Sequence, residues 1–197
     1  MSTDDLDCEG LPSFKRNHYF YGKLLSVEDF QIEQQYFVNK HRLINRLVHG
    51  TGIVSGLEVA KGIPIGTIEV SEGFALDGRG REVVLNTKFK CDLNQKYTPN
   101  DVGRERDLFV TIRYEETKVD PIPAPGETKT EFNMILEGAK IEVDWVPPDP
   151  SSTDTIFLAK ISTKTRRKKI CIEKIEDSAV VRGRTLTRVV IGKRKLA

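Results

Sequence analysis

Residues 26–50 read SVEDFQIEQQYFVNKHRLINRLVHG, and they predict the longest regular element of the chain, a helix from about Val27 to His49. Ser26 and Asp29 have the spacing of an N-terminal capping box, although the acid is Asp rather than the usual Glu or Gln. Gly50 is a favourable residue immediately after a helix, because glycine adopts the left-handed conformation easily. The start and the end of this helix are therefore both marked in the sequence.

The helix is expected to be amphipathic. Phe30, Phe37 and Ile44 are seven residues apart, which places them along one side of a helix. The opposite side is polar, with Gln31, Gln35, Asn39, Arg42 and Arg46. A helix of this extent is about 35 Å long. Its apolar stripe is expected to pack either against the chain's own sheet or against other copies or neighbouring subunits.

After Gly50 the sequence changes to short β-branched and alternating runs, which predict strands. Asp77-Gly78 lies between two apolar runs and predicts a hairpin. Residues 92–106 are polar and predict a loop, and Pro121, Pro123 and Pro125 predict a stiff exposed excursion. Strands are expected in residues 52–59, 67–70, 107–115, 156–161 and 169–175, on both sides of the turn in residues 71–85, and as one or two strands in residues 132–146. Residues 185–197 are expected to form a short strand or an arm.

This order of elements predicts an α+β protein. One long N-terminal amphipathic helix is followed by a mainly antiparallel β-sandwich or barrel, without the alternation of strands and helices that makes a parallel sheet. We expect residues 1–50 to form an N-terminal arm and the long helix. Residues 51–197 are expected to form a β-rich domain with a basic C-terminal segment.

Composition favours a protein with a large solvated surface and a modest core. Of the 197 residues, 38% are hydrophobic and 30% are charged, and the mean hydropathy is −0.38. This balance is typical of elongated or assembly proteins. No apolar run approaches the roughly 20 residues of a membrane-spanning helix, and the acidic N-terminus shows no secretory signal. Three separated cysteines, Cys8, Cys91 and Cys171, fit a reducing compartment.

Charge is unevenly distributed along the chain. Residues 160–197 hold 13 Lys and Arg against 3 Asp and Glu, although the whole chain has a formal net charge of only +2. This segment is expected to attract an acidic partner or the opposite pole of another copy, or to be a solvated strand face with a frayed tail. It lacks the interleaved aromatic residues of a base-stacking surface, so nucleic-acid binding is not expected.

No residue pattern indicates catalysis, a cofactor or a metal site. His41 and His49 are eight residues apart, too far along a helix to share a metal ion. No nucleophile elbow, dinucleotide-binding or P-loop motif is present. Gly78-Arg79-Gly80-Arg81 could imitate a phosphate-binding loop, but it lies in an expected hairpin without a helix N-terminus to supply aligned N–H groups. We therefore expect no catalytic, cofactor-binding or metal-binding residues.

Two segments together resemble a known family. The first is FYGKLLSVEDFQIEQQY at residues 20–36, continued by NRLVHGTGIVSGLEV at residues 45–59. The second is GFALDGRGREVV at residues 73–84. They are similar to small proteins encoded beside sheath, tube and baseplate components of phage-tail-like contractile injection systems, and to attachment domains of baseplate and tail-fibre proteins. The resemblance is good over residues 17–85 and looser in residues 107–116 and 136–146.

The resemblance implies a non-enzymatic structural subunit. Its partners would be other subunits of a tail-like particle, and it would be a homo-oligomer of three or six copies assembled in the cytoplasm. The interface candidates are Phe30, Phe37 and Ile44 on the helix and Arg79 and Arg81 in the turn, since guanidinium groups bind carboxylates of this or another subunit well.

Two other functions remain open at this stage. One is a carbohydrate- or receptor-binding β-domain that uses the aromatic residues of segment 19–21 and Trp145 as a stacking surface. The other is an enzyme of unrecognised type, which would need a pocket with two converging ionisable groups.

Overall fold

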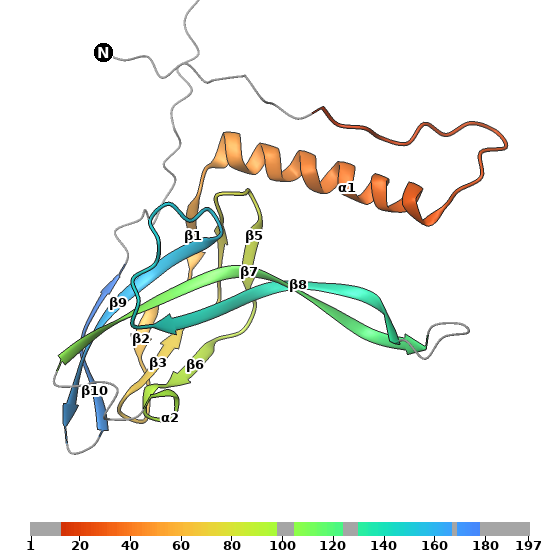
Figure 1. Cartoon of the computed structure of the whole chain (residues 1–197). Helices are drawn as coiled ribbons and strands as arrows, with labels where there is room; N and C mark the ends of the chain where they lie inside the picture. The colour runs from red at the N-terminus through yellow and green to blue at the C-terminus, as the bar shows by residue number, and fades with distance from the viewer. Residues whose placement is uncertain (1–12, 98–104, 124–129, 167–168, 178–197) are drawn as a thin grey trace, which may run out of the picture.

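The computed structural model describes residues 13–97, 105–123, 130–166 and 169–177. Within these ranges the chain is an α+β protein, in which a long N-terminal helix precedes antiparallel strands (Figure 1). The acidic first residues with Cys8, and the strand or arm expected at residues 185–197, lie outside the described residues. So do most of the loop expected at residues 92–106 and most of the basic C-terminal segment.

The predicted helix is confirmed. Helix α1 spans Val27–Ile44, and the π-helical segment η1 (Asn45–His49) continues it, so the helical stretch ends at the predicted residue. Gly50 follows with a φ of 75°, and its N–H donates to the carbonyl oxygen of Asn45 at 2.9 Å. No residue of α1 is buried. The described strands therefore do not cover the apolar stripe of α1.

The described strands pair into three antiparallel sheets. The first sheet has the order β1-β4-β5, the second β2-β3-β6 and the third β10-β9-β7-β8. The strands are β1 (Gly52–Gly56), β2 (Val59–Lys61), β3 (Thr67–Val70), β4 (Gly73–Leu76), β5 (Glu82–Leu85), β6 (Phe89–Asp92), β7 (Glu105–Pro123), β8 (Thr130–Asp144), β9 (Thr155–Arg166) and β10 (Lys169–Asp177). The antiparallel part of the prediction is confirmed, but a sandwich or barrel is not.

Two local predictions are wrong, one about a strand and one about a loop. Residues 52–59 were expected as one strand, but they form β1 and the start of β2, because Leu57 has a positive φ of 57° that turns the chain from the first sheet to the second. The polar loop expected from residue 92 begins with helix α2 (Leu93–Lys96), which Asp92 caps. Leu93 is fully buried there, so this one apolar residue anchors the helix to the core.

Strands β7 and β8 form a long hairpin that extends beyond the rest of its sheet. They pair from Phe109 with Asp144 to Pro123 with Thr130, whereas β9 pairs with β7 only as far as Arg113. Pro121 and Pro123 were expected in a stiff exposed excursion; they are exposed, but they lie within the regular strand β7. Strand β7 has only β8 as a partner at this point, and a proline without an N–H is tolerated at such an edge.

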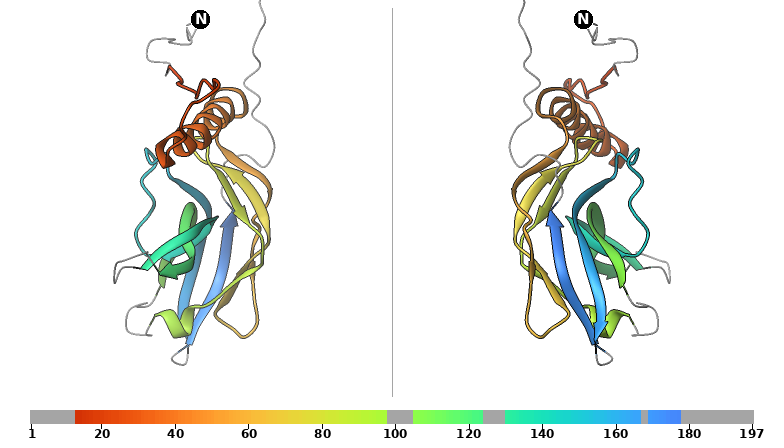
Figure 2. Two further views of the ribbon diagram at one scale, coloured as in Figure 1. Left: turned by 90° about the vertical axis from the view of Figure 1, so that its right-hand side faces the viewer. Right: turned by 90° about the vertical axis from the view of Figure 1, so that its left-hand side faces the viewer.

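The core lies where the three sheets meet. Its fully buried members include Ile68, Val70, Val83, Leu108, Val110, Ile112, Ile161 and Ile170. Figures 1 and 2 show α1 across one end of this β-rich part, with its N-terminal half projecting beyond the sheets. The β7–β8 hairpin extends in the same direction. The helix and the hairpin therefore project from the β-rich part on the same side.

Candidate interaction surface

The start of α1 is fixed by local contacts. Ser26 Oγ accepts from the N–H of Asp29 at 3.4 Å, and Asp29 Oδ2 accepts from the N–H of Ser26 at 3.0 Å, so the predicted capping box is confirmed. Lys23 Nζ lies 2.8 Å from Asp29 Oδ1. The hydrogen bond from Lys23, helped by the backbone of Ser26, lowers the pKa of the Asp29 carboxyl below its usual value.

The segment before the helix returns along its side. The Phe14 ring meets the Tyr36 ring edge-on at 6.4 Å, and Tyr36 in turn lies edge-on to Phe37 at 5.2 Å. Tyr19 Oη donates to Glu33 Oε2 at 3.2 Å. Residues 13–26 therefore cover one side of α1 without burying it.

The predicted helix residues are exposed. Phe30 is 58% exposed, Phe37 62% and Ile44 48%. Leu47 and Val48 of η1 extend the exposed apolar surface toward the end of the helix. These five residues form what we call the helix stripe. Since large exposed apolar patches usually mark interaction sites, the helix stripe is a candidate contact surface.

The C-terminal end of the helix is attached to the β4–β5 turn. Asn45 is only 5% exposed, and its Nδ2 donates to the carbonyl oxygen of Gly80 at 3.1 Å. His41 Nε2 lies 3.3 Å from Glu82 Oε1. Gly80 has a φ of 76°, and a Cβ there would overlap the carbonyl oxygen of Arg42. Glycine is therefore required at position 80 both by the backbone conformation and by the approach of the helix.

The turn itself is built around a buried carboxylate. Asp77 is fully buried, and its Oδ1 accepts from the N–H groups of Arg79 and Arg81 at 2.9 and 2.8 Å. The Arg81 guanidinium lies 2.6 Å from Asp77 Oδ2 and 3.2 Å from Asp154 Oδ1. Arg79 also forms an ion pair with Asp154. The expected hairpin is confirmed, although its positive φ belongs to Gly80 rather than to Gly78.

The two arginines predicted as interface residues differ from the three predicted helix residues, because both arginines already have partners within the chain. Arg81 is largely enclosed by partners of its own chain, whereas the Arg79 side chain is 60% exposed and lies over Asp154. The structure brings Ile44 near the turn through Asn45 and places Phe30 far away at the start of the helix. A role of these five residues in an interface stays a prediction.

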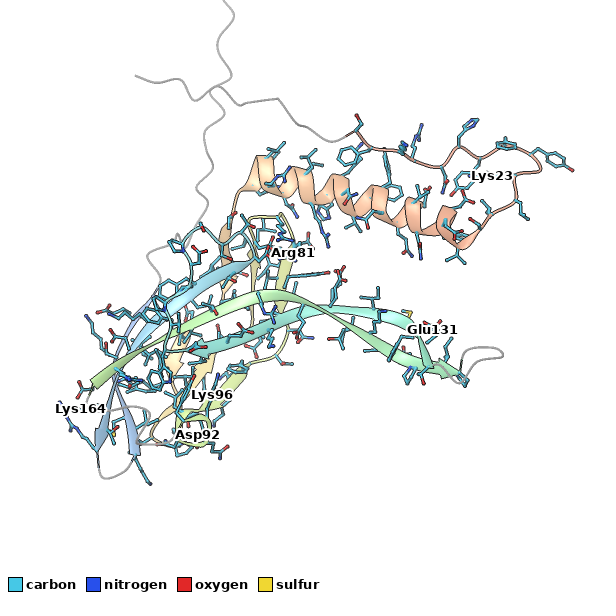
Figure 3. The ribbon with its side chains drawn as sticks, in the orientation of Figure 1. Lys23, Arg81, Asp92, Lys96, Glu131 and Lys164 are labelled. Atoms are coloured by element: carbon cyan, nitrogen blue, oxygen red, sulfur yellow. The ribbon has the colours of Figure 1, made fainter. Side chains whose placement is uncertain are left out.

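A groove lies between α1 and the β7–β8 hairpin. Its volume is about 800 Å³. The helix contributes Gln31, Ile32, Gln34, Gln35, Val38 and Arg42, and the hairpin contributes Glu116, Asn133, Met134, Ile135 and Glu137. Figure 3 shows this space between the helix and the hairpin, with Arg81 near its inner end and Glu131 near the far end of the hairpin. We call it the helix–hairpin groove.

Tyr114 lines a smaller pocket that shares Val38, Arg42 and Glu137 with the helix–hairpin groove. Its hydroxyl donates to Glu116 Oε1 at 2.8 Å, and the guanidinium carbons of Arg81 and Arg42 lie 5.0 and 5.8 Å from its ring centre. Burial, followed by the hydrogen bonds with Glu116 and Glu137, raises the pKa of Tyr114 well above its usual value. Sequence reasoning missed Tyr114 and Asn45, because no local pattern marks a tyrosine inside a strand or an asparagine inside a helix as a contact between distant elements.

Trp145 belongs to an aromatic cluster that is separate from the aromatic residues of segment 19–21. Trp145 packs against Tyr97, with the ring centres 4.6 Å apart and the ring planes tilted by 55°, and Arg106 lies over the Trp145 ring at 5.7 Å. Burial raises the pKa of Tyr97 to about 12, and its hydroxyl donates to the carbonyl oxygen of Val143. Tyr21 is fully exposed beside the start of α1. The structure therefore does not join segment 19–21 and Trp145 into one stacking surface.

The described residues contain neither a candidate metal site nor a candidate membrane-spanning helix. No group of three or more His, Cys, Asp or Glu side chains there is arranged to hold a metal ion. No helix in the same ranges combines the length and the apolar character needed to cross a bilayer.

Comparisons with known proteins give structural neighbours only. No protein-family model matches the chain, and no curated protein matches its sequence. Three solved structures cover 82% of this chain: a chain of the TssK–TssF–TssG baseplate subcomplex of the type VI secretion system (12% identity, TM-score 0.48), a chain of the type VI baseplate complex (9%, 0.45) and TssK (9%, 0.48). The match spans 60%, 58% and 41% of those chains, respectively. The neighbours are baseplate proteins, but likeness at this level does not assign a function.

Proposed function

We propose that this chain is a non-enzymatic structural subunit of a contractile injection system or phage-tail-like particle, and that it works through contacts with other protein subunits. The observation that carries the proposal is the exposed helix. No residue of α1 is buried, and the helix stripe leaves Phe30, Phe37 and Ile44 about half exposed or more. A long helix with this exposure needs a partner surface to bury its apolar side chains.

The hairpin supports the same proposal. Its outer half exposes Ile122, Phe132, Met134, Ile135 and Leu136. A projecting two-stranded hairpin with exposed apolar side chains is poorly stable in water unless another surface covers those side chains. Both projecting elements of the fold thus carry exposed apolar side chains.

The family resemblance gains a physical explanation from the fold. Its two segments, residues 20–59 and 73–84, meet where Asn45 bonds to Gly80 and His41 lies beside Glu82. Asp77, Gly80 and Arg81, which belong to the second of these segments, form the turn that contacts the C-terminal end of the helix. This arrangement supports a role in which the motifs set the direction of α1 rather than bind a substrate.

The particle assignment, the number of copies and the location are parts of the proposal. By the resemblance, the chain would assemble as a trimer or hexamer in the cytoplasm and end as a component of the finished particle. Its phage-tail-like character rests on the same sequence motifs.

Light scattering after size exclusion, together with co-purification, tests the proposal. The doubly substituted chain Phe30→Asp/Phe37→Asp should lose association with sheath or baseplate proteins encoded beside it, because two charges replace the centre of the helix stripe. Asn39→Asp is the matched control, since it adds a carboxylate elsewhere on α1. A wild-type chain that stays monomeric and co-purifies with no such protein would contradict the proposal.

A second candidate function keeps one observation in its favour. Tyr19, Phe20 and Tyr21 are exposed next to one another, as in surfaces that stack on sugar rings. Trp145 does not support this candidate, because its ring packs against Tyr97. A glycan array with the wild-type chain and with Tyr21→Ala would decide: binding that disappears in the variant supports a carbohydrate-binding role.

A further inference from the structure

The hairpin side of the helix–hairpin groove is acidic. Glu116 and Glu137 are directly opposite each other in the β7–β8 ladder, and both line the groove. Like charges at such a position repel each other. In the described outer half of the hairpin, residues 115–123 and 130–137, the only cation is Lys118. The acids there are Glu115, Glu116, Asp120, Glu131 and Glu137.

The groove has one cation of its own. Arg42 lines it from the helix side, and its guanidinium is 3.8 Å from Glu116 Oε1. Ile32, Val38, Met134 and Ile135 supply its apolar surface. Its volume of about 800 Å³ falls among clefts that hold a sizeable ligand, which are about 300–1,000 Å³. The groove thus suits an apolar segment with positive charges at its edges.

The β2–β3 turn of the same molecule is an apolar segment of this kind. The β2–β3 turn presents Ile63, 82% exposed, and Ile65, 69% exposed, with exposed Pro64 between them. We call residues 62–66 the isoleucine tip. Two isoleucines so exposed on one short turn are not explained by the fold, because neither contributes to the core.

The isoleucine tip is held in a fixed shape. Asn94 Nδ2 donates to the carbonyl oxygen of Ile65 at 3.0 Å, and Asn94 Oδ1 accepts from the N–H of Ile170 at 2.7 Å. The N–H of Leu93 donates to the carbonyl oxygen of Gly66 at 2.9 Å. A tip that is already ordered loses little conformational freedom on binding.

Cations flank the isoleucine tip. Lys61 precedes it in β2, and Arg166 and Lys169 border the neighbouring β9–β10 turn, whose strand β10 contacts the tip at Ile170. Lys61 Nζ bonds to the carbonyl oxygen of Glu173 at 2.9 Å, so it is directed toward β10. The acids on this side are Glu173, which pairs with Arg166 at 3.3 Å, Glu69, which lies beside Gly62 and pairs with Lys88 and Lys90 at 3.5 Å, and Asp92. The excess of charge around the tip is positive.

We propose that the isoleucine tip of one copy inserts into the helix–hairpin groove of a second copy. The occupant is a second copy because both halves of the complementary pair, an apolar tip with cations and an apolar groove with carboxylates, lie on this one chain. Figure 3 places them at different ends of the molecule: Asp92 and Lys96 mark the tip's side, whereas Arg81 and Glu131 mark the groove. A chain therefore cannot fill its own groove, and the contact is head-to-tail, which closes into a ring or extends as a filament.

Sedimentation velocity of the full chain over a concentration series tests this proposal. Ile63→Asp/Ile65→Asp should weaken self-association by about a hundredfold, because the tip loses the apolar burial that holds it in the groove. Val146→Asp is the matched control, since Val146 is 70% exposed and lies outside both surfaces. Circular dichroism should show the same fold for all three chains, because each substituted side chain points into water.

A charge exchange gives the sharper test. Lys61→Glu/Lys169→Glu makes the tip acidic, and Glu116→Lys/Glu137→Lys makes the groove basic. Each variant alone should associate weakly, whereas an equal mixture should recover hetero-association, because the altered tip then matches the altered groove. If neither double substitution weakens self-association, or if the equal mixture does not associate, the proposal is overturned.

Two other outcomes would also overturn it. A wild-type chain that stays monomeric at every concentration has no such contact, and the proposed role as a particle subunit would still be judged separately by co-purification. Binding to vesicles of phosphatidylserine and phosphatidylcholine that depends on Ile63 and Ile65, without self-association, would assign the tip to a lipid surface instead.

Discussion

Replacing Gly80 by Ala should detach the end of the long helix from the sheets. Gly80 has a φ of 76°, which costs an alanine about 1–2 kcal/mol. The new Cβ would also overlap the carbonyl oxygen of Arg42, so the helix must move and the bond from Asn45 to Gly80 is lost. An unpaired buried polar group costs about 1–3 kcal/mol, and the two effects together give roughly 2–5 kcal/mol.

Thermal unfolding and hydrogen exchange measure this loss. The melting temperature should fall by roughly 5–20 °C if the helix and the sheets unfold together. If only the helix is released, amide exchange in η1 should accelerate by about thirtyfold or more. Gly138→Ala is the matched control, because a Cβ at Gly138 meets no atom within 4 Å. A Gly80→Ala chain with wild-type melting and exchange would refute the idea that this contact holds α1.

Three further predictions follow from the charged and phenolic groups. Arg81→Leu leaves the buried carboxylate of Asp77 without its cation and should cost about 3–5 kcal/mol in urea unfolding, whereas Asp77→Asn should cost less; equal effects would contradict this. The pKa of Tyr97 is about 12 in the folded chain against an ordinary value of 10.0. Its contribution to the free energy of unfolding is therefore complete below pH 10 and is lost as the pH rises toward 12. The variant Tyr97→Phe should lack this fall in stability between pH 10 and 12. The lowered pKa of Asp29 means that its contribution is present above pH 3.8 and is lost as the pH falls further; Lys23→Met should raise the pKa of Asp29 in an NMR titration.

The helix boundaries could be predicted because their causes are local. Ser26 and Asp29 form the capping box within one helical turn, and Gly50 ends the helix by its own conformational freedom. The β4–β5 hairpin was predicted for the same reason, since Asp77 bonds to N–H groups only two and four residues away. In contrast, the prolines of β7 were misread, because their tolerance depends on whether a neighbouring strand lies on their other side.

The candidate surfaces could be predicted only in part. The exposure of Phe30, Phe37 and Ile44 agrees with the idea of an external partner, but the helical spacing alone is equally typical of a helix packed on its own sheet. The helix–hairpin groove was not predicted, because it depends on the direction of α1 and on the full length of the β7–β8 hairpin together.

The amino-acid sequence by itself determined the long helix and the compact Asp77 turn, since each depends on residues within a few positions of one another. The antiparallel character of the strands followed from the order of the elements along the chain. Only the tertiary structure decided that Arg81 reaches Asp154, 73 residues away, and that Asn45 reaches Gly80, 35 residues away. Such contacts depend on how separate elements meet in space, and a periodic pattern along one element carries no information about the surface of another. The directions of the helix and the hairpin, and therefore the surfaces open to a partner, follow from those contacts.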